Sequence, residues 1–296
     1  MNTPKKLLVC SELGRASEKA LHRAALLCAA TGASAEVLHV IEHPIEDAIG
    51  SFGLDNQAWH ENIRLAAMTA LEKQVQRHWP TGLEQPRIAL REGPVAQSIV
   101  DYVEEQGFDL VVCGARGSGP WKKYFIGTTA TRLVRRLNVP ALIVRRPAEA
   151  DYKRVLLPVD FSDYSARALE QTTMLMPRAR ITLMHAYEAP FEGKMAYSGV
   201  DEDAIAHYVR ARRTEAGQQI RELAQESGLK PGKFSLMLRH GHPYREVIEA
   251  QRHGEFDCIA IGKHGRGFIN HLLLGSTTEH VLLESPADVL VVPLPH

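Results

Sequence analysis

The most constraining feature of this sequence is an internal repeat. When the 296-residue chain is shifted by half its length, four glycines of the first half fall on four glycines of the second: Gly114, Gly117, Gly119 and Gly127 on Gly262, Gly265, Gly267 and Gly275. The same shift places Phe108–Asp109 on Phe256–Asp257 and Pro147 on Pro295. The chain is therefore expected to hold two copies of one domain, residues 1–148 and 149–296, joined near Pro147–Asp151.

Each copy alternates short apolar runs with stretches of helical periodicity. In the second copy this pattern predicts strands at 154–159, 181–187, 233–240, 256–262 and 288–293, with helices at 160–176, 203–227, 245–252 and 277–285. The first copy repeats the order, with strands near 5–10, 35–41, 86–92, 109–114 and 140–145. Strands that alternate with helices pair in parallel through right-handed crossovers. The sequence thus predicts an α/β fold whose sheets are covered on both faces.

Composition excludes several classes of partner. Lys+Arg and Asp+Glu both number 35, so the chain has no formal net charge. No overall electrostatic potential that would attract nucleic acid or a membrane surface is therefore expected. No stretch approaches the roughly 20 apolar residues of a membrane span, and the first ten residues lack the apolar region of a signal peptide. The four cysteines lie isolated in apolar segments without CxxC spacing. They are expected to be small core residues of a cytoplasmic protein rather than metal or redox groups.

The repeated glycines follow the fourth predicted strand of each copy. Ligands of such a sheet bind beyond the carboxyl ends of the strands, where the strand order reverses. Gly262 and Gly265 can turn the chain there and bring backbone N–H groups to a ligand. Gly275 and Ser276 then open a helix, whose N-terminus favours an anion. Two groups of hydrogen-bond donors at one place suit a polyphosphate. Because the same glycine spacing recurs in both copies, the alternative that these glycines serve only to turn the chain is the weaker explanation.

These residues resemble the universal stress protein family, whose nucleotide-binding members carry G-x2-G-x9-G-(S/T). The second copy matches with Gly262, Gly265, Gly275 and Ser276, and the first with Gly114, Gly117, Gly127 and Thr128. The resemblance covers both halves and looks like the tandem type. It implies two Rossmann-like domains of the adenine nucleotide alpha hydrolase-like class, each with a five-stranded parallel sheet and helices on both faces. It also implies ATP binding, with or without Mg²⁺, and a link to stress survival.

The resemblance also implies roles for particular residues of the second copy. Asp160 would contact the nucleoside, with Pro158 and Val159 beside it, and Ala186 would flank adenine. The phosphates would be held by the glycine loop that follows Ile261 and by the next hydroxyls, namely Gly262, Gly265, Gly275, Ser276 and Thr277. His264, inside this loop, is expected to contact a phosphate oxygen. A charged acceptor suits a ribose hydroxyl, and the alternative for Asp160 is a helix N-cap or an acidic residue of the first helical turn.

The first copy departs from the pattern in its first loop. Glu12 stands at the position of Asp160 and Cys10 at that of Pro158, and the longer glutamate would either intrude on a ribose or swing away. The glycine loop itself is complete, and Lys122 and Lys123 add positive charge to it. We therefore expect nucleotide chiefly in the second copy. The first copy holds a second candidate site, made of Glu12, Gly114, Gly117, Gly127, Thr128 and Thr129.

Histidines gather near the predicted crevice of the second copy: His240, His242, His264, His271 and His280. A zinc site or a catalytic base at His240 and His242 is the less favoured interpretation. His39 and His185 occupy matching places in the second strands and are expected to be core-edge residues with a satisfied hydrogen bond.

The sequence favours binding over catalysis, because it offers phosphate cradles but no clear second carboxylate for Mg²⁺ and no base in a defined place. The nucleotide would then favour one conformation of the loop. The alternatives are a slow ATP hydrolase or phosphotransferase, and an interaction module that holds a non-nucleotide ligand. The last strands, 140–145 and 288–293, are apolar edges that are expected to pair with each other within the molecule. A homodimer of the whole chain is compatible with this arrangement.

Overall fold

The computed structural model describes residues 4–42, 56–115, 127–229, 232–265 and 273–294. The chain divides into two compact units. Unit 1 comprises Met1–Asp151 and the short segment Met174–Pro177, and unit 2 comprises Tyr152–Thr173 and Arg178–Leu294. None of the described helices combines the length and the apolar composition needed to cross a membrane.

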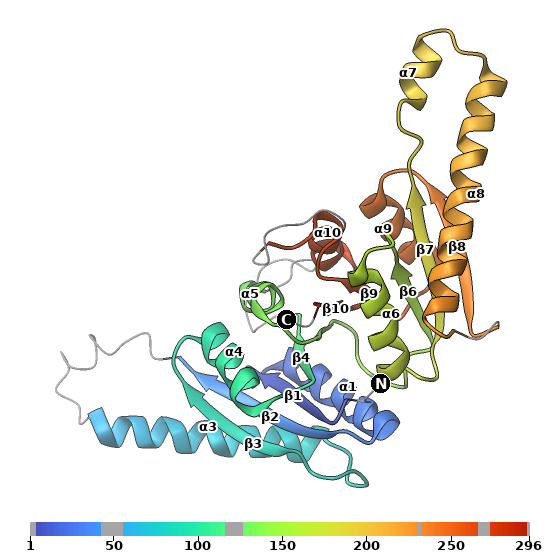
Figure 1. The fold of residues 1–296 in the computed structure, drawn as a ribbon. Helices are drawn as coiled ribbons and strands as arrows, with labels where there is room; N and C mark the ends of the chain where they lie inside the picture. The colour runs from blue at the N-terminus through green and yellow to red at the C-terminus, as the bar shows by residue number, and fades with distance from the viewer. Residues whose placement is uncertain (1–3, 43–55, 116–126, 230–231, 266–272, 295–296) are drawn as a thin grey trace. The chain divides into compact units, whose positions relative to one another are not determined.

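Unit 1 is a parallel sheet covered by helices on both faces (Figure 1). Its elements are β1 (Lys6–Ser11), α1 (Arg15–Thr31), β2 (Ser34–Ile41), α3 (Asn56–His78), β3 (Arg87–Glu92), α4 (Val95–Gln106), β4 (Leu110–Gly114), α5 (Thr128–Arg136) and β5 (Ala141–Val144). The strand order is β3-β2-β1-β4-β5, and all the pairings are parallel. Helices α1 and α3 pack together, as do α4 and α5. This arrangement confirms the predicted α/β class.

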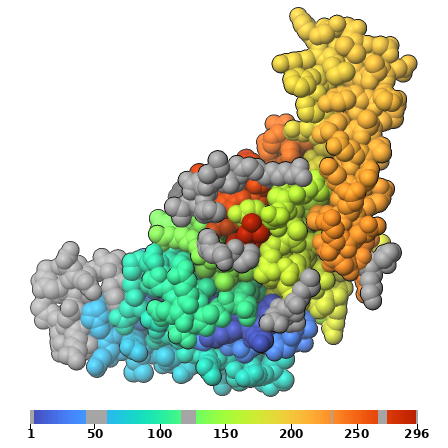
Figure 2. Space-filling model, in the orientation of Figure 1, coloured from blue at the N-terminus to red at the C-terminus, as the bar shows by residue number. Residues whose placement is uncertain are grey.

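Unit 2 repeats the arrangement. Its elements are β6 (Arg154–Pro158), α6 (Asp163–Leu175), β7 (Arg180–Tyr187), α7 (Glu192–Tyr197), α8 (Glu202–Glu226), β8 (Phe234–His240), α9 (Pro243–Gly254), β9 (Cys258–Gly262), α10 (Ser276–Glu284) and β10 (Asp288–Val292). The parallel order is β10-β9-β6-β7-β8. The short helix α7 was not predicted from the sequence. Figure 2 shows α7 and the N-terminal part of α8, in yellow and orange, as an extension of unit 2.

The central strands are buried on both faces, which explains why they read as continuous apolar runs rather than as alternating patterns. All residues of β9 are buried, as are all but one residue each of β1 and β4. In unit 1, β1 pairs with both β2 and β4, and in unit 2, β6 pairs with both β7 and β9. The strand order reverses at these central strands. The connections on the two sides of this point run in opposite directions, which leaves a crevice at the carboxyl ends of the strands in each unit.

The repeated Phe–Asp pair has a structural role at the opposite end of these strands. Asp109 Oδ2 accepts hydrogen bonds from the backbone N–H groups of Lys5 (2.7 Å) and Lys6 (3.0 Å). Asp257 Oδ2 accepts the matching bonds from Lys153 (2.7 Å) and Arg154 (2.9 Å). Each aspartate thus ties the start of the first strand to the start of the fourth. This bond pair helps to set the register of the two strands that flank the crevice.

Candidate functional site

A cavity of about 340 Å³ lies where the strand order of unit 2 reverses. All eleven residues that the sequence analysis selected in the second copy line it: Pro158, Val159, Asp160, Ala186, Ile261, Gly262, His264, Gly265, Gly275, Ser276 and Thr277. Six further lining residues were not selected: Ser165, Met184, His185, Pro243, Val247 and Thr278. The structure therefore brings the ends of β6, β7 and β9, the start of α9 and the start of α10 to one place.

Asp160 has two sides with different surroundings. Its Oδ1 accepts hydrogen bonds from Ser162 N (3.1 Å), Ser162 Oγ (2.5 Å) and Ser165 Oγ (2.6 Å). These bonds hold the turn that leads into α6. Asp160 is neither the N-cap of this helix nor part of its first turn, because α6 begins at Asp163 and Ser162 Oγ accepts a hydrogen bond from Ser165 N (3.4 Å). Its Oδ2 faces the glycine loop, because a Cβ placed on Gly265 would lie only 2.5 Å from it. The carboxylate after the first strand and the loop after the fourth strand thus meet directly.

The turn beside Asp160 is strained in both units. Phe161 adopts a left-handed backbone with φ 61°, and Leu13, at the matching position of unit 1, has φ 62°. A residue other than glycine pays about 1–3 kcal/mol for such a conformation, and such residues concentrate at functional sites. The Phe161 ring lies 4.4 Å from the ring of His185, measured between centroids. Because both units contain the same strained turn, the turn is a regular part of this domain, next to the cavity.

The helix α10 presents an uncapped N-terminus to the cavity. Gly275 occupies the N-cap position with an extended backbone, and a glycine has no side chain that could cap the helix. The amides of a first helical turn have no intrahelical acceptor, and the helix dipole adds positive potential at this end. Two hydrogen bonds hold α10 against the end of β9: Thr278 Oγ1 donates to Gly262 O (2.8 Å), and Gly275 N donates to Lys263 O (3.1 Å). This end of the cavity is suited to an anion.

The glycines of the loop serve different purposes. A Cβ on Gly262 would lie 2.6 Å from Tyr164 Cβ, so this glycine is needed for close packing against α6. That reason differs from the one we predicted, which was close approach of the backbone to a ligand. Gly265 leaves room for the Asp160 carboxylate, as described above. A Cβ on Gly275 would meet its nearest described neighbour at 3.4 Å, so none of the residues that the structure describes forbids a side chain there.

The rest of the wall is largely apolar. Met184, Ile261 and Val247 contribute hydrophobic side chains opposite the polar residues of the loop. His185 is fixed by a hydrogen bond of 2.7 Å between its Nδ1 and Val159 O, and His39 makes the matching bond of 2.8 Å to Ser11 O. These two bonds confirm the predicted satisfied hydrogen bond of each histidine. The cavity thus combines an apolar wall with an end suited to an anion, a combination that fits an amphipathic ligand.

The other histidines near the crevice are engaged in pairwise contacts. His240 Nε2 lies 3.0 Å from Glu192 Oε2, and the His240 ring stacks on Tyr187. His242 and His280 both contact the ring of Tyr244. Within the described ranges, no group of three or more His, Cys, Asp or Glu side chains is arranged to hold a metal ion. His271 lies outside the described residues.

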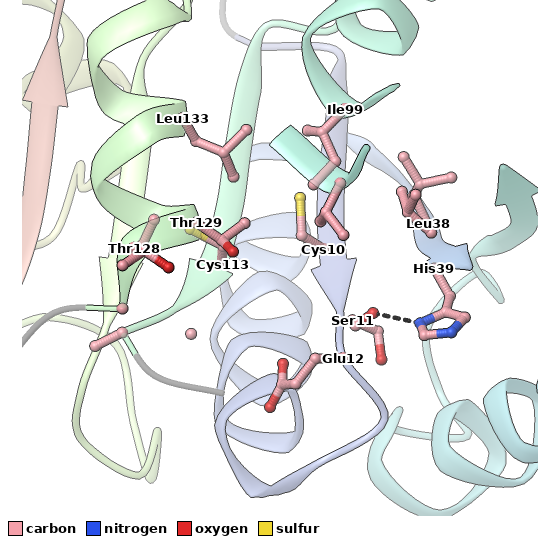
Figure 3. Close-up of a pocket in the computed structure, with 16 residues that line it drawn as sticks. Cys10, Ser11, Glu12, Leu38, His39, Ile99, Cys113, Thr128, Thr129 and Leu133 are labelled. Atoms are coloured by element: carbon pink, nitrogen blue, oxygen red, sulfur yellow. Dashed lines mark hydrogen bonds between the residues drawn. The ribbon is translucent and has the colours of Figure 1, made fainter. Parts of the chain in front are cut away.

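Unit 1 has a cavity of about 320 Å³ at the matching place (Figure 3). Five of the six residues predicted for this second site line it: Glu12, Gly114, Gly127, Thr128 and Thr129. Gly117, together with Lys122 and Lys123, lies outside the described residues. Figure 3 shows the apolar side chains of Leu38, Ile99 and Leu133 on one side and the polar Ser11, Glu12, His39 and Thr128 on the other. This cavity has the same two-sided character as that of unit 2.

The carboxylate of unit 1 is held differently. Glu12 Oε1 accepts a hydrogen bond from Ser17 N (3.3 Å), so the side chain turns back onto the first turn of α1. Ser17 Oγ donates to Gly14 O (2.8 Å), whereas the matching Ser165 Oγ donates to Asp160. Gln74 supports this loop from α3, where its Oε1 accepts from Ser11 Oγ (2.7 Å). Glu12 still lines the cavity, and the two outcomes predicted for the longer glutamate stay predictions.

Comparison with known proteins gives consistent matches over both halves. The model of the Universal stress protein family matches residues 3–145 and 151–293. Universal stress protein MJ0531 of Methanocaldococcus jannaschii is 27% identical over 153 residues, covering 51% of this chain and 87% of that protein. Universal stress protein Slr1230 of Synechocystis is 23% identical over 309 residues, covering 97% and 99%. The crystal structure of a universal stress protein from Archaeoglobus fulgidus superposes with a TM-score of 0.70 at 21% identity, covering 97% of this chain and 98% of that one, so the fold is shared.

Proposed function

The chain belongs to the universal stress protein family, as a member with two such domains in tandem, and on that premise we propose that unit 2 binds ATP or a related adenine nucleotide. The observation that carries this proposal is the convergence of Asp160, the glycine loop and the uncapped start of α10 on one cavity. We place the boundary between the two domains at residues 148 and 149.

The cavity offers a distinct surface to each part of such a ligand. The phosphates would lie at the N-terminus of α10, where backbone amides and the hydroxyls of Ser276 and Thr277 donate hydrogen bonds. The Asp160 side chain would accept from a ribose hydroxyl, and the adenine would lie against Ala186 and Val247. A Mg²⁺ ion, when bound with the nucleotide, would offset phosphate charge and take oxygen ligands. Asp160 is the only carboxylate among the described lining residues, so the phosphate end is free of negative side chains.

The nucleotide would serve as a bound signal in a stress-response protein rather than as a rapidly turned-over substrate. Phosphoryl transfer needs a positioned nucleophile and a carboxylate to hold the metal, and the described lining of the cavity supplies one carboxylate that is already bonded in the turn before α6. Release of phosphate under saturating ATP separates this function from a slow hydrolase or phosphotransferase. A non-nucleotide ligand would be revealed by mass spectrometry of what co-purifies. The pairing of the edge strands β5 and β10 stays a prediction.

Calorimetric titration of the full chain with ATP tests the proposal. We expect Asp160→Ala to weaken binding about 10- to 100-fold, because a hydrogen bond to a charged group contributes about 1.5–3 kcal/mol and each 1.4 kcal/mol is a factor of ten. Asp160→Asn keeps an acceptor for Ser162 and Ser165, so it separates loss of the charge from loss of the turn. The matched control is Glu12→Ala in unit 1, for which the affinity should change less than about twofold. An unchanged affinity in Asp160→Ala would show that the nucleotide does not bind here.

A further inference from the structure

The cavity of unit 1 contains two cysteines. Cys10, at the end of β1, and Cys113, near the end of β4, both line it (Figure 3). The two residues are direct partners in the parallel pairing of β1 with β4. Residues that are partners on neighbouring strands point to the same face of the sheet, and the strands lie about 4.8 Å apart. The two thiols therefore belong to one side of one cavity, on neighbouring strands.

Unit 2 has no such pair. At the matching positions it carries Pro158 and Ile261, which also line its cavity. Of the four cysteines, all free and all in the described part of the chain, Cys28 and Cys258 line neither of these two cavities. The expectation that the cysteines are only core residues rested on the lack of CxxC spacing. That criterion misses a pair which the sheet, rather than the local sequence, brings together.

Both thiols are held in the neutral form. Burial, helped by the negative charge of Glu12, raises the pKa of Cys113 to about 12. Burial also raises the pKa of Cys10 well above its usual value, and the neighbouring Cys113 adds to this effect. Because the thiolate is the form that attacks peroxides and disulfides, these cysteines are protected against oxidation by such reagents. A reaction that converts two neutral thiols into a neutral product suits this site better than a reaction through a thiolate, because the cavity wall is apolar.

We propose that Cys10 and Cys113 form a dithiol site that captures small trivalent organoarsenicals, which are soft thiophiles with one apolar substituent. In the reaction with an arsine oxide, two As–S bonds form and the arsenic–oxygen double bond is lost. The oxygen leaves as water with the two thiol protons, and the arsenic stays trivalent, so no oxidant or reductant is required. The substituent would pack against Leu38, Ile99 and Leu133, which face the same cavity. This site is independent of nucleotide binding in unit 2.

Phenylarsine oxide and intact-mass spectrometry of the reduced full chain test this inference. We expect one phenylarsine group per chain, bound with loss of one water, which resists a large excess of glutathione and is removed by 2,3-dimercaptopropanol. Cys113→Ile installs the residue that unit 2 carries at the matching position, and Cys10→Ala removes the other thiol. Each should weaken retention at least about 100-fold, because the second As–S bond of a chelate forms at high effective concentration.

The matched control is Cys28→Ala, in which the adduct should be unchanged. Thermal unfolding of each variant shows that the domains are folded, and the calorimetric ATP titration of unit 2 gives a second measure of an intact chain. The inference is overturned if the folded wild type takes up no glutathione-resistant adduct, or if the adduct persists in both Cys10→Ala and Cys113→Ile. An adduct that maps to Cys28 or Cys258 would also overturn it.

Discussion

Replacing Gly265 with alanine is expected to weaken ATP binding to unit 2 about 10- to 100-fold. The new Cβ would lie 2.5 Å from Asp160 Oδ2, so either the carboxylate or the loop must move. If the carboxylate moves, the ribose loses its charged acceptor, and if the loop moves, its amides leave the phosphates. Crowding of this kind costs about 1–3 kcal/mol, which corresponds to the expected loss of affinity.

A double-mutant cycle makes this prediction specific. In the Asp160→Ala background the carboxylate that causes the clash is gone, so Gly265→Ala should cost much less there than in the wild type. The matched control is Gly193→Ala in α7, where a Cβ would meet no atom of the described residues within 4 Å. Additive effects of the two substitutions, measured by calorimetry, would contradict the direct contact between the carboxylate and the loop.

Replacing Gly262 with alanine is expected to destabilise unit 2 by about 1–3 kcal/mol, whether or not nucleotide is present. The added Cβ would lie 2.6 Å from Tyr164 Cβ and 3.1 Å from the Tyr164 backbone carbon. Neither atom can be moved by rotating a side chain, so α6 must shift away from β9. Gly114→Ala should act alike in unit 1, where the Cβ would lie 2.6 Å from Ala16 Cβ and 2.7 Å from the Ala16 backbone.

Thermal unfolding measures this second prediction. For a domain of 150–250 residues, each kcal/mol lowers the melting temperature by about 2–4 °C, so the loss should be readily visible. Gly82→Ala is the control in unit 1, because a Cβ there would lie more than 4 Å from every neighbouring atom in the described part of the chain. Melting temperatures of Gly262→Ala and Gly114→Ala equal to that of the control would show that the strands and helices are not packed as closely as described.

Much of the architecture could be predicted because the internal repeat and the alternation of elements admit few arrangements. Parallel strands bring their carboxyl ends to one edge, so the acidic residue after β6 and the glycines after β9 had to be neighbours. The predicted helix over 203–227 agrees with α8 (Glu202–Glu226), and the predicted strand over 288–293 agrees with β10 (Asp288–Val292). The carboxyl ends of the strands, together with the repeated glycines, were sufficient to place the cavity.

Other features depend on contacts that no local pattern contains. Pro243 and Val247 line the cavity from α9, although nothing in their own segment indicates a site. They could have been found by the shift between the copies, since Val95 and Ile99 line the cavity of unit 1 at the matching positions. Gly262 is required because a side chain there would clash with α6. Cys10 is brought beside Cys113 by the register of β1 with β4. Each is a consequence of tertiary packing.

The central claim is that the backbone after β9 and the start of α10 hold a chain of phosphates. Hydrogen exchange of the full chain, measured by mass spectrometry with and without saturating ATP, tests it most directly. We predict that ATP slows exchange in peptides covering 262–265 and 275–278 and leaves the peptides covering the matching residues 114–117 and 127–130 of unit 1 nearly unchanged. ATP binding without protection of 262–265 and 275–278, or with protection only in the unit 1 peptides, would contradict the account.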